Sequence, residues 1–154
     1  MKKALFTGTF DPYTIGHDSV VRRALTFMDE IVIAVVERNV HKQSLSSNEQ
    51  RVKMIQDLYA DEPCVNVLPF HNLAVDFAKE QGAQFIIRGV RSISDFEYEK
   101  EMAEMNKRLS GIETILLLTE PELACVSSSM VRELLSYGKD VSAFLPKGMK
   151  LLKG

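Results

Sequence analysis

Five short apolar runs alternate with segments of helical periodicity along the 154-residue chain, and this alternation restricts the fold more than any other feature. The runs cover residues 4–7, 31–36, 65–70, 85–87 and 114–118, and their β-branched composition predicts strands that are buried on both faces. We therefore expect an α/β fold, a doubly wound, five-stranded parallel sheet with helices on both faces and right-handed crossovers. Ligands bind beyond the carboxyl ends of the strands in such sheets, so the loops after the runs should carry the function.

Capping patterns indicate where several helices begin. Residues 46–50 contain a serine followed three positions later by Glu or Gln, which predicts a capping box. Ser94 and Asp95 are candidate caps of a later helix. A further helix should begin near Ser128, and a short C-terminal helix is expected around residues 147–152. Because no repeat or long linker interrupts the pattern, we expect a single domain over residues 1–154.

Charge and cysteine content exclude several classes of protein. The formal net charge of −2 gives no general affinity for nucleic acid or an anionic membrane, so phosphate binding would need a local cluster of basic side chains. The two cysteines, Cys64 and Cys125, fit neither a disulfide framework nor a zinc site. There is no signal-like segment and no apolar stretch of about 20 residues. We expect a cytoplasmic protein with no nucleic-acid or membrane partner.

The segment at residues 7–17, Thr-Gly-Thr-Phe-Asp-Pro-Tyr-Thr-Ile-Gly-His, is the most informative in the sequence. It joins the first strand to an amphipathic helix, and Gly8 allows a close approach of the backbone to a ligand. Backbone N–H groups of the turn and of the helix N-terminus predict an anion site, to which His17 can add an imidazole N–H. The alternative is that His17 is only a surface or capping residue.

Two later segments also place phosphate-binding groups at strand ends. In residues 87–99, Arg88 and Arg91 flank Gly89 before a helix, where each guanidinium could hold a phosphate through bidentate contacts. Residues 126–132 bring three consecutive serines to a helix start, where hydroxyls and backbone N–H groups face outward. Taken singly, the arginines could be solvated surface charges and a serine could be an ordinary N-cap.

These segments resemble the motifs of a known family. Residues 14–17, Thr-Ile-Gly-His, resemble the T/H-x-G-H signature of the nucleotidylyltransferase superfamily. Thr14 stands where many members carry a first His, and the phosphopantetheine adenylyltransferases share that replacement. The blocks at 7–17, 87–99 and 126–132 are each similar to a block of that family. The resemblance implies a Rossmann-like fold.

The resemblance extends from Lys3 to about Pro146, and this sequence departs from the family pattern at four further places. One is the lysine-bearing loop, where Lys42-Gln43-Ser44 stands in place of the usual K-K-P. Thr7 replaces a proline, Ala74 replaces a larger apolar residue on the acceptor side, and Leu123 replaces an aromatic residue in the loop on the adenine side. The changes at Leu123 and Ala74 concern the packing of the nucleobase and the pantetheine arm rather than the reaction, and the change at Thr7 is minor.

The resemblance implies transfer of AMP from ATP to 4′-phosphopantetheine, giving dephospho-coenzyme A and pyrophosphate. It assigns catalysis to His17 and Lys42. His41, the neighbour of Lys42, is interpreted as an exposed loop residue. The implied ATP-binding residues are Thr9, Phe10, His17, Gly89, Val90, Arg91, Glu99, Leu123, Ala124, Cys125, Val126, Ser127, Ser128 and Ser129. The implied acceptor-binding residues are Thr9, Lys42, Leu73, Ala74, Arg88 and Asn106.

The resemblance also carries expectations about cofactor and assembly. Mg²⁺ should accompany the triphosphate, with no metal-ligating residue in the chain. Coenzyme A is a possible feedback ligand, and a homohexamer is implied.

Three other functions remain open from the residues alone. A related transferase could act on nicotinate mononucleotide, or with CTP on glycerol 3-phosphate, although such enzymes usually keep the first His. A noncatalytic nucleotide-binding module of the same fold would bind ATP without releasing pyrophosphate, because fold alone does not fix function.

Overall fold

The computed structural model describes residues 1–37 and 45–151 and contains one parallel sheet. Its strands, in spatial order β3-β2-β1-β4-β5, are parallel at each pairing. Their bounds are β1 Lys3–Gly8, β2 Glu30–Val36, β3 Val65–Phe70, β4 Phe85–Val90 and β5 Glu113–Leu118. The predicted fold class is confirmed. The fourth strand is longer than predicted, because its ladder with β5 continues through Arg88 and Gly89 to Val90.

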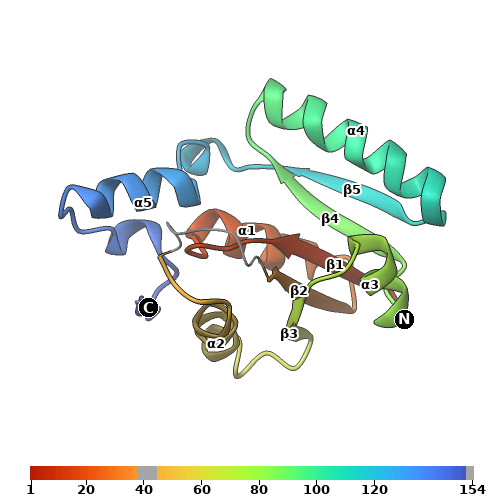
Figure 1. Cartoon of the computed structure of the whole chain (residues 1–154), viewed down its shortest axis with the longest axis horizontal. Helices are drawn as coiled ribbons and strands as arrows, with labels where there is room; N and C mark the ends of the chain where they lie inside the picture. Colours follow the sequence, from red (N-terminus) through yellow and green to blue (C-terminus); the bar gives the residue numbers. More distant parts are fainter. Residues whose placement is uncertain (38–44, 152–154) are drawn as a thin grey trace.

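Helices cover both faces of the sheet (Figure 1). Their bounds are α1 Ile15–Ala24, α2 Asn48–Leu58, α3 Ala74–Glu80, α4 Ile93–Ser110 and α5 Ser128–Ser136, with short 3-10 helices at Pro121–Leu123 and Ser142–Phe144. α1 and α2 pack on the face that carries Phe6 and Ile33, whereas α3 packs on the face that carries Leu5 and Val32. Since successive strand side chains point to opposite faces, one apolar run fills both halves of the core.

The order of the strands reverses next to β1. From β1 the chain winds through β2 to β3 on one side, and it then returns to form β4 and β5 on the other side. Such a reversal leaves a crevice beyond the carboxyl ends of the two strands that flank it, here β1 and β4. In Figure 1 these ends point toward the part of the molecule where α5 lies. The fold therefore places the segments after β1 and β4 together.

Three details of the sequence-based prediction were wrong. Described residues 147–151 form a turn rather than a helix, because Gly148 adopts φ +84° and the Met149 and Leu151 side chains pack against two separate apolar clusters. β3 and β5 are the two edge strands and carry exposed or partly exposed side chains, so neither is buried on both faces. The cap of α4 is Ser92, whose Oγ accepts from the Asp95 N–H. The capping box predicted within 46–50 is confirmed for Ser47 and Gln50.

No helix within the described parts of the chain has the length and apolar character needed to cross a bilayer.

Gly8 ends β1 at a point where a side chain would collide with the core. Phe10 has φ +53°, and its buried ring turns back so that a Cβ on residue 8 would lie 2.7 Å from Phe10 Cε1. That ring is held by Phe6 and Tyr13, with centroid separations of 5.3 Å to each. The glycine thus allows the turn to be closed by an aromatic side chain, in addition to the ligand approach that the sequence predicted.

We expect Gly8→Ala to lower the free energy of unfolding by about 1–2 kcal/mol, because the Phe10 ring must leave its packed position. Urea titration would measure the change. Gly16→Ala is the matched control, since a Cβ there meets its nearest neighbour, Thr14 Oγ1, at 3.4 Å, an ordinary contact. Equal destabilisation by the two substitutions would contradict this explanation of Gly8.

Candidate active site

A cavity of about 410 Å³ lies where the segments after β1 and β4 meet the start of α5. Its wall comes from the β1–α1 loop, the first turn of α1, the end of β4 with the start of α4, and the first turn of α5. The N-termini of α1 and α5 both contribute, with N-caps Thr14 and Ser127. Two positive helix ends and their outward N–H groups make this cavity suited to an anion of several charges.

His17 is fixed by a capping box with Thr14. The Thr14 N–H donates to His17 Nδ1 at 2.9 Å, and the His17 N–H donates to Thr14 Oγ1 at 3.4 Å. Because Nδ1 is an acceptor, the ring proton of the neutral imidazole is on Nε2. Thr14 therefore sets the tautomer of His17, which lines the cavity and can offer its Nε2–H to a ligand. His17 is therefore a capping residue of α1 and also lines the cavity, so the two interpretations made from the sequence are compatible.

The environment of His17 keeps its imidazole neutral. Burial among aromatic rings, and then the positive charges of Arg88 and Arg91, lower its pKa from 6.5 to about 3. The Phe10 ring meets it edge-on at a centroid distance of 5.0 Å, and the Tyr13 ring lies beside it at 5.2 Å. His17 can act near neutral pH as a hydrogen-bond donor, but it cannot supply a positive charge.

The start of α5 is bound to the β1–α1 loop. Ser128 Oγ donates to the Pro12 carbonyl oxygen at 2.6 Å, and Arg132 Nη1 donates to the Asp11 carbonyl oxygen at 2.7 Å. Arg132 Nη2 also donates to Ser129 Oγ at 3.2 Å. The bonds to the Pro12 and Asp11 carbonyl oxygens join segments more than a hundred residues apart in the sequence. The serine-rich start of α5 and the β1–α1 loop therefore form a single wall of the cavity.

Asp11 joins the same loop to the segment before α2. Its carboxylate accepts from the N–H groups of Leu45 and Ser46, at 2.9 and 3.1 Å. The buried Arg51 on α2 donates from Nη1 to the Ser46 carbonyl oxygen and from Nη2 to the Val36 carbonyl oxygen, at 3.2 and 3.1 Å. These contacts hold the described chain on both sides of residues 38–44. Lys42, one of the two predicted catalytic residues, and His41 lie outside the described residues.

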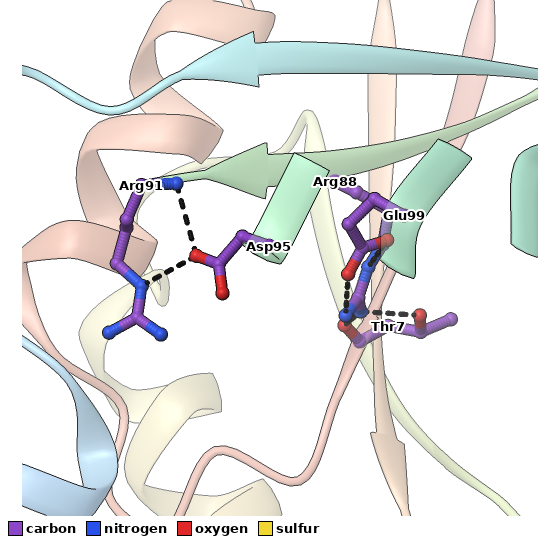
Figure 2. A network of polar contacts seen from close by, with 5 residues as sticks. All are labelled: Thr7, Arg88, Arg91, Asp95 and Glu99. Atoms are coloured by element: carbon purple, nitrogen blue, oxygen red, sulfur yellow. Dashed lines mark hydrogen bonds and ion pairs between the residues drawn. The ribbon is translucent and has the colours of Figure 1, made fainter. Parts of the chain in front are cut away.

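Arg88 is held by protein groups rather than left open for a bidentate phosphate (Figure 2). Its Nε and Nη2 donate to the two carboxylate oxygens of Glu99, at 2.9 and 2.8 Å. Its Nη1 donates to the carbonyl oxygen and, at 3.1 Å, to the Oγ1 of Thr7. One N–H of Nη2 is left for a ligand. The expectation of a bidentate grip by Arg88 is wrong for this conformation, because Glu99 occupies that side of the guanidinium.

Arg91 presents its guanidinium differently. Its Nε donates to Asp95 Oδ2 at 3.0 Å, and its backbone N–H donates to the same oxygen at 3.1 Å. No described residue accepts from the two terminal nitrogens, and in Figure 2 the dashed lines from Arg91 start only at Nε and the backbone nitrogen. Of the two predicted arginines, Arg91 is therefore the one whose terminal nitrogens can hold an anion in this conformation.

Most of the predicted site residues meet in the cavity. Those that line it are Thr9, Phe10, His17, Arg88, Gly89, Arg91, Glu99, Val126, Ser127, Ser128 and Ser129. Val90 is buried beside it, and Leu123, Ala124 and Cys125 lie in or just after the 3-10 helix that precedes α5, outside the lining. Leu73 and Ala74 begin α3, and Asn106 lies on the adjacent α4, again outside the lining.

The structure adds residues that the sequence did not assign to the site. Arg132, Asp11 and Thr14 each line the cavity and each fix a neighbouring element. The sequence did indicate that Arg132 could belong to the site. It lies four positions after Ser128 and three after Ser129, and this spacing places the side chains on one face of a helix. Asp11 lies in the segment at residues 7–17 that the sequence singled out, but its partners, Leu45 and Ser46, lie more than thirty residues away and could not be predicted from that segment.

The carboxylates around the cavity are already engaged by the protein. Asp11 binds backbone N–H groups, Asp95 binds Arg91, and Glu99 binds Arg88. Within the described ranges, no group of three or more His, Cys, Asp or Glu side chains could hold a metal ion. A divalent cation would therefore have to take its ligands chiefly from a bound polyphosphate.

The fold and the cavity are consistent with the protein families that the sequence of this chain matches. Residues 5–134 match a family model described as cytidylyltransferase-like, which places the chain in the nucleotidylyltransferase class. Proteins named phosphopantetheine adenylyltransferase are 57% identical in Phocaeicola vulgatus, 56% in Bacteroides thetaiotaomicron and 42% in Flavobacterium psychrophilum. Each similarity covers 98% of this chain and 99% of the relative. The chain belongs to the phosphopantetheine adenylyltransferase family, so the predicted family and enzyme class are confirmed.

Proposed function

We propose that this chain transfers AMP from ATP to 4′-phosphopantetheine, giving dephospho-coenzyme A and pyrophosphate, in the cavity beyond β1 and β4. The observation that carries the proposal is the convergence of two helix N-termini, the neutral His17 and the terminal nitrogens of Arg91 around one cavity. All of these groups favour negative charge or donate to it, as a triphosphate requires. The names of the relatives supply the acceptor.

The reaction needs positioning and charge stabilisation rather than a protein nucleophile. An oxygen of the acceptor phosphate attacks the α-phosphorus, a new P–O bond forms, and the bond from the α-phosphorus to the bridging oxygen breaks as pyrophosphate leaves. His17 donates its Nε2–H to the α-phosphate as charge develops there. Lys42 is assigned to the same charge by family resemblance, and Thr9 orients the phosphates.

The departing pyrophosphate is assigned to the wall made by α5 and Arg91. Ser127 to Ser129 supply hydroxyls and the helix N-terminus, and Arg91 supplies two terminal nitrogens that do not bind Asp95. Arg132, which already bonds Ser129, adds positive charge to this wall. These groups would stabilise the negative charge of the departing pyrophosphate through charge-assisted hydrogen bonds.

The acceptor is assigned to the side of the cavity near Arg88. Arg88 contributes its remaining N–H and its charge to the phosphate, with Lys42 as a second cation. Leu73, Ala74 and Asn106, on α3 and α4, would contact the pantetheine arm. Leu73 is 53% exposed, which leaves an apolar surface for such an arm.

Mg²⁺ belongs to the proposal as a companion of ATP. When bound, it would neutralise charge on the β- and γ-phosphates. This fits a cavity in which Asp11, Asp95 and Glu99 already have protein partners, because the triphosphate brings its own oxygen ligands.

Assembly as a homohexamer and feedback by coenzyme A are further parts of the proposal. The apolar side chains exposed along α4 support association between copies of the chain, among them Ile93 at 80%, Met105 at 54% and Leu109 at 59% exposure. Light scattering of the purified chain would measure the assembly, and a monomer at micromolar concentration would refute it.

A pyrophosphate-release assay over a panel of acceptors tests the function. We expect 4′-phosphopantetheine with ATP to support turnover, and glycerol 3-phosphate or nicotinate mononucleotide with ATP or CTP to give little or none. Faster turnover of another acceptor would replace the proposed substrate while keeping the reaction class. Binding of ATP with no pyrophosphate from any acceptor would favour the noncatalytic alternative.

A further inference from the structure

Tyr13 lies against His17 without lining the cavity. The two ring centroids are 5.2 Å apart at an interplanar angle of 31°, and Tyr13 is 1% exposed. Phe10 contacts the same imidazole edge-on, at an interplanar angle of 87°. Tyr13 therefore limits the positions of the imidazole while having no place among the residues that can touch a ligand in the cavity.

The Tyr13 hydroxyl belongs to a directed chain of hydrogen bonds. Tyr13 Oη lies 2.6 Å from Tyr59 Oη, and Tyr59 Oη donates to a carboxylate oxygen of Asp18. Since the Tyr59 proton is used toward the carboxylate, Tyr13 must donate to Tyr59. Burial raises the pKa of both phenols, so the direction of the chain is preserved through the working pH range.

This chain of hydrogen bonds is anchored between α1 and α2. Tyr59 caps the C-terminal end of α2, and Asp18 follows His17 directly on α1. Arg22 donates from Nε to Asp18 at 3.3 Å and lies over the Tyr59 ring, 5.2 Å from its centroid. Movement of Tyr13 would break a buried hydrogen bond, so its ring has a fixed position.

We propose that Tyr13 is a positioning residue for His17, held in place by Tyr59 and Asp18. The proposal rests on the proposed function, in which the His17 Nε2–H must meet the developing charge on the α-phosphate. The bond from Thr14 N–H fixes Nδ1 but leaves the imidazole free to tilt about that bond. The Tyr13 ring, inclined at 31° to the imidazole, and the Phe10 ring, at 87°, remove this freedom, so Nε2–H keeps one direction before ATP arrives.

The test combines turnover with spectroscopy on the full chain. Tyr13→Phe keeps the ring and removes the hydroxyl, whereas Tyr13→Leu removes the ring. We expect kcat to fall about threefold in the first variant and about thirtyfold in the second, with the KM for ATP changed less than about twofold. In a His17→Ala background, Tyr13→Leu should change the residual kcat less than about twofold, because its effect acts through the imidazole. Tyr137→Phe, at a position 73% exposed, is the control and should leave kcat unchanged.

A readout independent of turnover separates this proposal from the proposed function. The ¹⁵N resonances of the His17 ring should show the Nε2-protonated tautomer in the wild type and in Tyr137→Phe, and should shift or broaden in Tyr13→Leu. Unchanged His17 resonances in Tyr13→Leu would overturn the proposal even if the chain has no transferase activity. An equal loss of kcat with and without His17 would also overturn it, because the loss would then come from the fold.

Discussion

His17→Ala is expected to reduce kcat at least about a hundredfold while leaving the fold and the KM for ATP nearly unchanged. In the proposed mechanism the imidazole supplies one directed donor to charge that develops in the transition state, and loss of such a donor typically costs about 10²–10³ in rate. Pyrophosphate release under saturating substrates would measure the effect. His71→Ala is a matched control, because the His71 side chain is 81% exposed and lies outside the cavity.

The pH dependence adds a second check on His17. With a pKa of about 3, the imidazole of the folded protein stays neutral. A plot of kcat against pH should therefore show no rise or fall caused by titration of His17 between about pH 5 and pH 9. The unfolded chain binds a proton there near the ordinary pKa of 6.5, so stability should fall as the pH drops from about 6.5 toward 3. His17→Gln should weaken that decline. If kcat changed with pH around pH 6.5, and this change disappeared in His17→Gln, the imidazole would be charged during turnover.

Arg88→Met is expected to lower the free energy of unfolding by about 3 kcal/mol. The substitution keeps an apolar stem of similar length but leaves the Glu99 carboxylate, on a residue 7% exposed, without its cationic partner. Removal of one member of a buried pair costs about 3–5 kcal/mol, and the 30% exposure of the Arg88 side chain favours the lower end. The midpoint of thermal unfolding should fall by about 6–12 °C.

Two further variants separate the ion pair from other roles of Arg88. Arg88→Met/Glu99→Leu removes both charges and should recover most of the lost stability. Arg91→Met should cost less than about 1 kcal/mol, since the Arg91 and Asp95 side chains are 39% and 28% exposed. If Arg88→Met lowered the free energy of unfolding as little as Arg91→Met, Glu99 would not depend on Arg88.

Binding titrations, corrected for the fraction of folded protein, should also distinguish the two arginines. We expect Arg88→Met to weaken binding of the acceptor more than binding of ATP, and Arg91→Met to weaken binding of ATP more than binding of the acceptor.

The sheet was the part of the structure most accessible from the sequence. Continuous apolar runs such as residues 31–36 require burial on two faces, and only a parallel sheet covered by helices provides it. The prediction was wrong where local chemistry competed with tertiary contacts. Arg88 and Gly89 interrupt an apolar run, yet strand pairing with β5 extends β4 through both. A helix was predicted around residues 147–152, but Gly148, at φ +84°, turns the chain there.

The site was predictable where its residues form compact motifs, and less so where they depend on distant partners. His17 and Ser127 to Ser129 could be read from helix starts, and the cavity contains all of them. Arg88 was expected to hold a phosphate through a bidentate contact, because no local pattern shows that Glu99, eleven positions later, already binds its Nε and Nη2. The tautomer of His17 likewise depends on a single backbone N–H whose direction only the folded turn defines.

The contacts of Arg51 have a consequence for how this enzyme family can vary. Because its guanidinium bonds the carbonyl oxygens of Val36 and Ser46, and Asp11 bonds the adjoining N–H groups, the chain leaves the sheet and returns to α2 at anchored points. Lengthening the segment between these anchors by a few residues would add only a few tenths of a kcal/mol in closure entropy. The Asp11 and Arg51 contacts would therefore keep the sheet, the β1–α1 loop and the start of α2 in place even if residues were inserted between these anchors.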